Sequence, residues 1–382
     1  FIVRCQSWYQ TAWRATLTGS ALYTMRAAMT LLRRFIPLWF AFAALAGAQP
    51  LPVRGIHLPA PKPEDMPLAL RFIQEALPKE GANLLILEFN YHVRYASHPE
   101  VVDADALSLD QVRELAAACR AANVRLIPMI NLLGHQSWAK TTFGLLRSHP
   151  EFDETEGKYP DNQGIYCRSY CPLHPRLHAV LFDLIDELVD AAGADACHAG
   201  MDEVFRLGEA DCPRCRGKNR AELFAGEVQA VHDHLAARGK EMWMWGDRFI
   251  DGVETGIGKW EASENQTEPA LRLIPKDVVI TDWHYEQAHP TAAHFALSGF
   301  RVVSSPWRKT SVALAQLAQI RDVRAHSTAK NRDRMLGMLH TTWVGFAPFV
   351  QAYFKEGPPP GVEASESVQC FRELFRELRS SR

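Results

Sequence analysis

The sequence predicts a single domain folded as an α/β (β/α)8 TIM barrel with a C-terminal helical tail. Eight short aliphatic and β-branched runs alternate with longer amphipathic segments from Arg54 onward. Continuous apolar runs of this length are typical of parallel strands that are buried on both faces. The roughly 330 residues that follow Ala48 are enough for eight strand–helix units.

The apolar runs are the predicted strands, and the amphipathic segments between them are the predicted helices. Ser108 followed by Gln111 indicates a capping box at the start of one helix. We predict strands at residues 54–58, 83–89, 124–132, 194–201, 241–246, 278–284, 301–305 and 335–342. We predict helices at about 65–78, 108–122, 174–192, 219–238, 290–298 and 310–325.

The chain divides into three segments. We predict that residues 1–48 are a leader and signal peptide, that residues 49–356 form the catalytic barrel, and that residues 357–382 form the helical tail. The Gly- and Pro-rich run at 357–361 breaks the chain before a final helix at about 364–380. A doubly wound open sheet is the alternative fold, but no glycine-rich phosphate loop follows the first predicted strand, where Gly55 stands alone.

The amino-terminal segment carries the three parts of a secretory signal. Arg33-Arg34 form a basic flank, an apolar run covers residues 35–45, and Ala46-Gly47-Ala48 is an A-x-A cleavage site. The run is shorter than the about 20 residues that span a membrane. We expect cleavage after Ala48 and a secreted or periplasmic protein, with an N-terminal membrane anchor as the alternative.

The charge balance argues against nucleic acid as a partner. Lys and Arg number 42 against 44 Asp and Glu, the formal net charge is −2, and the basic residues are spread along the chain. Such a chain offers no basic face to neutralise phosphates. We expect neither nucleic acid nor, once the signal is removed, a membrane as a partner.

Four of the eight cysteines form two close pairs, Cys167-x3-Cys171 and Cys212-x2-Cys215. Export would permit disulfides within or between the pairs, and a four-thiolate zinc site is the other interpretation. The spacing does not choose between them. Cys119 and Cys197 lie in apolar segments, where we expect buried, inert thiols.

The sharpest functional signal is residues 198–203, H-A-G-M-D-E, at the end of the fourth predicted strand. Active sites of such barrels lie at the carboxyl ends of the strands. Because side chains alternate along a strand, we expect His198, Gly200 and Asp202 on one face, with Glu203 turning over the mouth. Gly200 should leave room for a sugar ring. The alternative is that Asp202 caps a turn and Glu203 is a solvated charge.

The H-x-G-x-D-E pattern resembles the signature of glycoside hydrolase family 20, the β-N-acetylhexosaminidases, and especially its hexosaminidase D-like branch. The resemblance covers most of residues 54–345 and implies exo-acting release of terminal N-acetylglucosamine or N-acetylgalactosamine. Arg54 is similar to the family arginine that binds sugar hydroxyls. Residues 131–135, N-L-L-G-H, depart from the family, which has an acidic residue and Pro before Gly-His.

The resemblance implies substrate-assisted retaining catalysis, in which the 2-acetamido oxygen of the substrate attacks the anomeric carbon. Glu203 would be the general acid/base, and Asp202 would hold the acetamide N–H and stabilise the positively charged intermediate. Two carboxylates this close should raise one pKa, which suits an acid. The resemblance implies neither a metal nor a cofactor.

Aromatic residues follow several predicted strands and predict a tryptophan-lined pocket, because indole rings stack on sugar rings. Tyr285 resembles the family tyrosine that binds the acetamide carbonyl. We expect His198 to support Asp202 from below, and Glu88 to line the pocket or pair with Arg54. The predicted substrate-binding residues are Arg54, His135, His198, Trp243, Trp245, Asp247, Trp283, Tyr285 and Trp343.

Three other functions fit part of this pattern. A retaining glycosidase with two protein carboxylates would need Asp247 or Glu286 about 5 Å from Glu203. A carbohydrate-binding barrel without catalysis is disfavoured by the intact Asp-Glu pair. The third alternative is a metal-dependent hydrolase, whose ligands would come from His57, His135, His198, Asp202 and His284. Against it, the sequence has neither an H-x-H motif on the first predicted strand nor a helical H-E-x-x-H motif.

Overall fold

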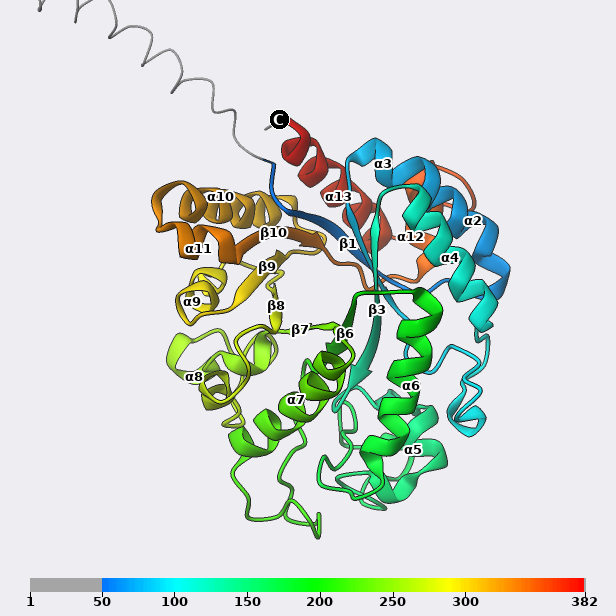
Figure 1. Ribbon diagram of the computed structural model, residues 1–382, viewed down its shortest axis with the longest axis vertical. Helices are drawn as coiled ribbons and strands as arrows, with labels where there is room; N and C mark the ends of the chain where they lie inside the picture. The colour runs from blue at the N-terminus through cyan, green and yellow to red at the C-terminus, as the bar shows by residue number, and fades with distance from the viewer. Residues whose placement is uncertain (1–49, 381–382) are drawn as a thin grey trace, which may run out of the picture. The chain divides into compact units, whose positions relative to one another are not determined.

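The protein is described by a computed structural model that places residues 50–380. The predicted leader and signal peptide, residues 1–48, lie outside the described residues. Residues Leu51–Ser380 form one compact unit. Its eight barrel strands are all parallel and close into a ring that is surrounded by helices, which confirms the predicted TIM barrel (Figure 1).

The eight predicted strands are all present, and their boundaries differ from the prediction by only a few residues. Neighbouring strands follow one another around the barrel, and β1 closes it by pairing with both β2 and β10. The barrel strands are β1 (Val53–Pro59), β2 (Leu84–Glu88), β3 (Arg125–Leu132), β6 (Ala196–Gly200), β7 (Glu241–Trp245), β8 (Val279–Trp283), β9 (Arg301–Ser305) and β10 (Met335–His340).

The helices that cover the barrel include every predicted one. The capping box is confirmed, since the Ser108 hydroxyl accepts the Gln111 N–H and the Gln111 side chain accepts the Ser108 N–H. The long helices are α4 (Leu109–Ala121), α6 (Leu177–Ala192), α7 (Arg220–Ala237), α10 (Thr310–His326) and α13 (Val362–Ser380). The shorter ones are α2 (Met66–Arg71), α3 (Leu77–Glu80), α5 (Gly144–Ser148), α8 (Gly252–Thr255), α9 (Thr291–Leu297), α11 (Ala329–Arg334) and α12 (Phe346–Phe354).

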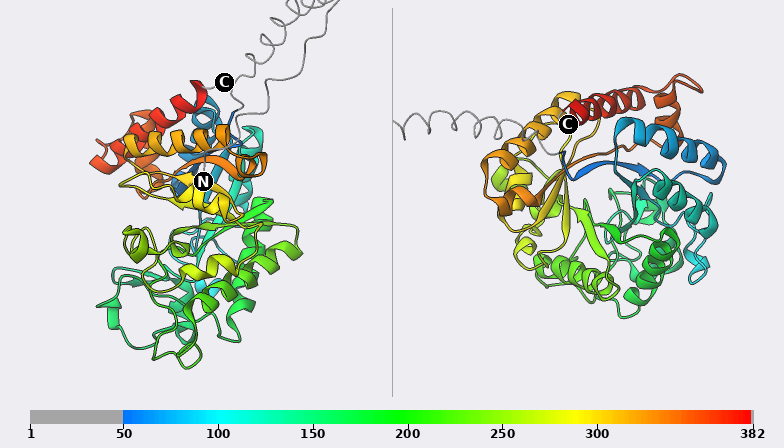
Figure 2. Two further views of the ribbon diagram at one scale, coloured as in Figure 1. Left: turned by 90° about the vertical axis from the view of Figure 1, so that its left-hand side faces the viewer. Right: turned by 45° about the horizontal axis from the view of Figure 1, so that its top comes forward.

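A short two-stranded hairpin after β3 was not predicted. It is formed by β4 (Ser137–Trp138) and β5 (Thr141–Thr142). At the other end of the chain, α13 lies beside α10 and α12 (Figure 2). It buries Phe371, Leu374 and Phe375 against the barrel unit. None of the helices described between residues 50 and 380 combines the length and the hydropathy that a membrane span requires.

The core has two layers because side chains alternate along each strand. On β7, Met242 and Met244 face the surrounding helices, whereas Trp243 and Trp245 fill the barrel interior. Both tryptophans are at most 1% exposed. The barrel is therefore filled, and a substrate can bind only in the loops above its carboxyl-terminal rim.

The amino-terminal rim of the barrel holds the predicted sugar-binding arginine, so that prediction is wrong. Arg54 is the second residue of β1, and its guanidinium donates to the Gly81 carbonyl at 3.0 Å and the Leu51 carbonyl at 2.6 Å. At about 3.3 Å per residue, Arg54 lies roughly 16 Å from the other end of its strand at Pro59. Its side chain is anchored away from the mouth.

Glu241 joins three strands at the same rim. It begins β7 and accepts from Arg125 at 2.6 Å and from Arg301 at 2.5 Å, the first residues of β3 and β9. Burial alone would raise the pKa of Glu241, but the two guanidinium groups lower it to about 2. A carboxyl with a depressed pKa stabilises the folded state above its ordinary pKa, and this contribution is lost as the pH falls.

We therefore predict that Glu241→Gln lowers the melting temperature near neutral pH and that this difference shrinks as the pH falls from about 4.5 to about 2. Thermal unfolding followed by circular dichroism across this range measures it. Asp110→Asn, which changes an exposed carboxylate, is the control and should follow the wild type. Parallel curves for wild type and Glu241→Gln would contradict the role of this ion pair.

Candidate active site

The carboxylate pair follows β6 directly, at the carboxyl-terminal rim of the barrel. Asp202 and Glu203 both contact His135, which comes from the loop after β3. His135 Nε2 lies 3.4 Å from Asp202 Oδ2 and 3.1 Å from Glu203 Oε2. One ligand-type atom from each of the three side chains lies within 4.8 Å of the others. The structure thus brings together three of the predicted site residues.

Asp202 is held in its ionised form. It is 5% exposed, and the Asn131 amide donates to its Oδ1 at 2.9 Å. Burial alone would raise the pKa of Asp202, but the charge of His135 and these contacts outweigh it and lower the pKa. Conversely, burial opposes protonation of His135, but the carboxylates raise its pKa well above the ordinary value. We infer a buried pair of a carboxylate and an imidazolium.

Glu203 is held through both its side chain and its backbone. The Tyr166 hydroxyl donates to Oε2 at 2.8 Å, and the Glu203 N–H donates to Asp247 Oδ2 at 2.9 Å. Tyr166 lies in the long loop between β3 and α6 and was missed by the sequence analysis. It belongs to no periodic run and to no predicted strand end, so no local signal marks it.

Asp247 is not free to contact a substrate as predicted but is buried against the backbone of Glu203. It is 1% exposed and also accepts from Arg248 Nε at 2.7 Å and from the Trp283 indole at 3.2 Å. Burial, opposed by Arg248, raises the pKa of Asp247 to about 6. Because Asp247 is buried against three protein donors, it positions Glu203 and Trp283 rather than contacting a sugar.

The backbone around the pair is folded into left-handed conformations. Gly200, Met201 and Glu203 have φ of 67°, 65° and 47°, and in the facing loop His135 has a φ of 50°. Non-glycine residues with positive φ each cost about 1–2 kcal/mol, and such strain clusters at functional sites. Because β6 ends at Gly200, the predicted alternation does not extend to Asp202, which is presented by a turn.

Gly200 makes room for a side chain and not, as predicted, for a sugar ring. A Cβ atom at this position would lie 2.2 Å from Asn131 Oδ1 and 2.7 Å from Asn131 Cα. Asn131 Oδ1 accepts the Met201 N–H at 3.1 Å, so this close approach joins the ends of β3 and β6. In the sequence, Asn131 stands out only as a departure from the family pattern.

Two predicted substrate contacts lie too deep in the barrel to reach a ligand. His198 is fully buried, and its ring nitrogens bond Thr281 Oγ1 at 2.8 Å and the Gly200 N–H at 3.1 Å. Burial lowers the pKa of His198 to about 3, so the ring is neutral. Trp243, which pairs with His198 in the sheet register, fills the barrel interior. Both predictions of sugar contact are corrected.

The other predicted aromatic residues meet in a continuous wall. Trp245 is fully buried, so its predicted sugar contact is also corrected, and it supports Trp343, with ring centroids 5.9 Å apart. The Trp283 ring packs against the Tyr285 ring, with centroids 4.9 Å apart. The Trp343 indole donates to the Tyr285 hydroxyl at 2.8 Å, which joins the two pairs. Trp343 is 37% exposed, so the wall opens to solvent. Trp307 extends the wall, since its ring centroid lies 5.4 Å from that of Tyr285.

A second aromatic group lies on the Glu203 side and was not predicted. Tyr166 contacts Trp138, Phe205 and Trp260 with ring centroids 5.3, 5.6 and 4.9 Å apart. Trp138 and Trp260 are 53% and 45% exposed, which is unusual for tryptophan. Through Tyr166, whose hydroxyl donates to Glu203, this second aromatic group reaches the carboxylate pair.

The remaining histidines of the metal-hydrolase alternative do not converge on the pair. His57 Nε2 lies 3.5 Å from Glu88, which therefore pairs with His57 and not with Arg54. His284 pairs with Glu261 and Asp282. Among residues 50–380, Asp202 groups with His135 and Glu203 as a potential set of metal ligands, but His57 and His198 join no such group.

Comparison with known proteins places the chain in a family. Residues 90–339 match the family described as glycosyl hydrolase family 20, catalytic domain. A bovine (Bos taurus) hexosaminidase D is 24% identical over 181 residues, which are 45% of this chain and 48% of the relative. The matched segment thus spans about half the length of that protein.

Solved structures share the fold. A β-N-acetylhexosaminidase superposes with a TM-score of 0.62 at 15% identity, over 87% of this chain and 76% of the other. An exo-β-N-acetylglucosaminidase from Vibrio harveyi, solved with N-acetylglucosamine, superposes with a TM-score of 0.57 at 17% identity. That likeness covers 86% of this chain and 58% of the other.

We predict that Gly200→Ala destabilises the protein by at least about 2 kcal/mol, because alanine is strained at this positive φ and its Cβ would displace Asn131. Chemical denaturation measures the change. Gly226→Ala is the matched control, since Gly226 lies in α7 with open space around its Cα and the change should stabilise the protein by up to about 1 kcal/mol. Equal stability of the two variants would refute the close approach at Gly200.

Proposed function

Because the chain belongs to glycoside hydrolase family 20, we propose that it is an exo-acting β-N-acetylhexosaminidase that removes terminal N-acetylglucosamine or N-acetylgalactosamine. The observation that carries the proposal is the Asp202–Glu203 pair, bridged by His135 at the barrel mouth. The proposal also rests on the aromatic wall, which supplies stacking faces for a pyranose ring and an apolar surface for an acetamide methyl.

Asp202 is the proposed partner of the acetamido group. Asn131 and His135 fix its orientation, and its lowered pKa keeps it charged. An ionised Asp202 would accept the acetamide N–H and so turn the carbonyl oxygen toward the anomeric carbon. It would then offset the positive charge that develops on the cyclic intermediate.

Glu203 is the proposed general acid/base. In the first step its carboxyl group would give a proton to the departing glycosidic oxygen while the acetamido oxygen bonds to the anomeric carbon. In the second step it would take a proton from the water that opens the intermediate. Tyr166 and Asp247 hold Glu203 for both steps, from the side-chain end and from the backbone.

A two-carboxylate mechanism is less well supported because neither candidate nucleophile is available. Asp247 is buried and accepts hydrogen bonds at both oxygens. The Glu286 side chain is 61% exposed and pairs with Lys309 on the surface. The acetamido oxygen of the substrate is therefore the nucleophile that the site favours.

The test is release of 4-nitrophenol from its N-acetyl-β-glucosaminide, its N-acetyl-β-galactosaminide and its plain β-glucoside. We expect activity on the acetamido substrates alone, and a fall in kcat of at least about 100-fold in Glu203→Gln, because general acid/base catalysis is lost. Glu286→Gln is the matched control and should be fully active. Equal activity on the glucoside, or an active Glu203→Gln, would overturn the site assignment.

We also propose that the protein is exported and cleaved after Ala48, on the basis of the basic flank at Arg33-Arg34 and the apolar run that follows it. Expression of the whole sequence in a bacterial host, followed by N-terminal sequencing of the exported protein, should give Gln49 as the first residue. A membrane-bound chain with an intact N-terminus would instead support the anchor.

A further inference from the structure

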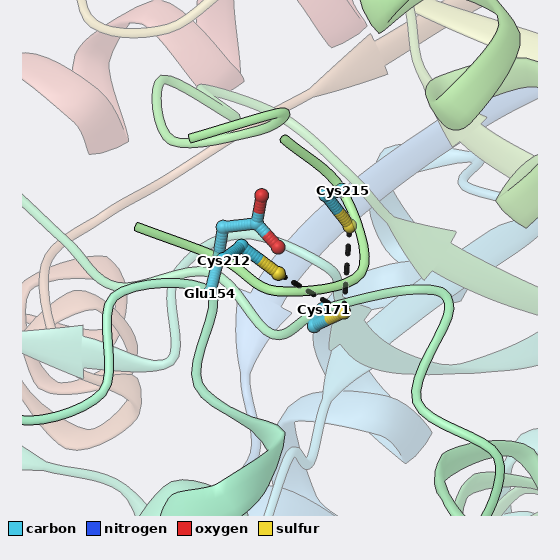
Figure 3. A group of neighbouring side chains, drawn as sticks. All are labelled: Glu154, Cys171, Cys212 and Cys215. Carbon is cyan, nitrogen blue, oxygen red and sulfur yellow. Dashed lines mark hydrogen bonds between the residues drawn. The ribbon is translucent and has the colours of Figure 1, made fainter. Parts of the chain in front are cut away.

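A buried cluster of three cysteines and one glutamate lies away from the carboxylate pair. Cys171 and Glu154 come from the loop between β3 and α6, and Cys212 and Cys215 come from the loop between β6 and α7 (Figure 3). The bridge between Asp153 and Tyr170 brings the first two together. All four ligand residues are at most 1% exposed.

The sulfur spacing fits a shared ion better than a disulfide. Cys171 Sγ lies 3.4 Å from Cys215 Sγ and 3.5 Å from Cys212 Sγ. A disulfide needs about 2.05 Å. Thiolates at about 2.3 Å from a tetrahedral zinc ion are about 3.8 Å apart, which is close to the spacing observed. One ligand atom from each of the four side chains lies within 4.8 Å of the others.

Glu154 gives independent evidence for a cation. Its Oε1 accepts the Glu209 N–H at 2.9 Å, but its buried Oε2 has no hydrogen-bond partner among the described residues. Figure 3 shows the carboxyl group directed toward the cysteines. A buried, unpaired carboxylate oxygen is costly unless a cation faces it.

The chain around Cys212 and Cys215 is shaped to present both thiols from one turn. The Cys212 carbonyl accepts the Arg216 N–H and the Cys215 carbonyl accepts the Lys218 N–H, each at 3.1 Å. Gly217, which lies between the two donor residues, adopts a φ of 73°. A C-x2-C turn of this kind is a common half of a zinc site.

We propose that Glu154, Cys171, Cys212 and Cys215 bind one Zn²⁺ ion as a structural site. Three sulfur ligands select a borderline-soft metal over Mg²⁺ or Ca²⁺, and a closed set of four buried ligands leaves no position for a substrate. The four-thiolate site considered from the sequence is thereby corrected. Cys167 is not a ligand, since its thiol is directed to the Glu203 carbonyl at 3.8 Å, and Glu154 takes its place.

The ion would join the two loops that build the mouth of the barrel. The loop after β3 carries His135 and Tyr166, and the loop after β6 carries Asp202 and Glu203. Joining them at the cluster would hold Tyr166 against Glu203, because loops of this length otherwise carry a large conformational entropy. The proposal does not depend on the reaction that the site catalyses.

The test is the metal content of the whole protein. The protein is purified without chelators, and its metals are measured by inductively coupled plasma mass spectrometry. We expect about one zinc per chain in the wild type and in Cys119→Ala, a buried cysteine in α4. Cys212→Ala should lose the metal. Glu154→Gln, which keeps the side-chain volume, should bind zinc at least about tenfold more weakly in competition with a chromogenic chelator.

A spectroscopic readout decides the matter if Cys212→Ala does not fold. Wild-type protein reconstituted with Co²⁺ should show sulfur-to-metal charge transfer and the strong visible bands of tetrahedral cobalt. A wild type that holds no zinc and takes up neither zinc nor cobalt would overturn the proposal. So would a disulfide within the cluster, detected as an intact mass lower by two hydrogens and located among Cys171, Cys212 and Cys215 by peptide mapping.

Discussion

The position of the carboxylate pair depends most on the hydrogen bonds that Asn131 makes. The side-chain amide of Asn131 donates to Asp202, and its side-chain oxygen accepts the Met201 N–H. The backbone N–H of Asn131 donates to the Asn90 side chain. One residue thus joins the ends of β2, β3 and β6. Only glycine at position 200 permits this approach, so the position of the carboxylate pair follows from the packing of two neighbouring strands.

Charge compensation is the second condition for this site. Two carboxylates within a few ångströms of each other would repel, and burial strengthens that repulsion. A protonated His135 between them supplies the compensating charge, and Arg248 does the same for Asp247. The strained backbone at Met201, Glu203 and His135 is the cost of aiming these groups at one point.

The barrel and its loops have separate tasks. The barrel interior is filled by Trp243, Trp245 and His198, so it supplies a rigid floor. Recognition and proton transfer are left to the loops, and the longest of these, between β3 and α6, supplies both His135 and Tyr166. A structural ion at Cys171 and Cys212 would explain how such a loop holds Tyr166 in register with Glu203.

The eight strands, most of the helices and the Asp202–Glu203 pair could be predicted from the sequence, because hydrophobic periodicity and the residues at strand ends are local properties. How deep a strand residue lies depends on how the closed barrel packs, so His198 and Trp243 were wrongly expected to contact a sugar. Arg54 begins its predicted strand, and only the family resemblance suggested that it binds the sugar. Contacts between distant loops, such as Tyr166 with Glu203 and Glu154 with Cys212, leave no local pattern. They exist because barrel closure brings separate loops to one rim.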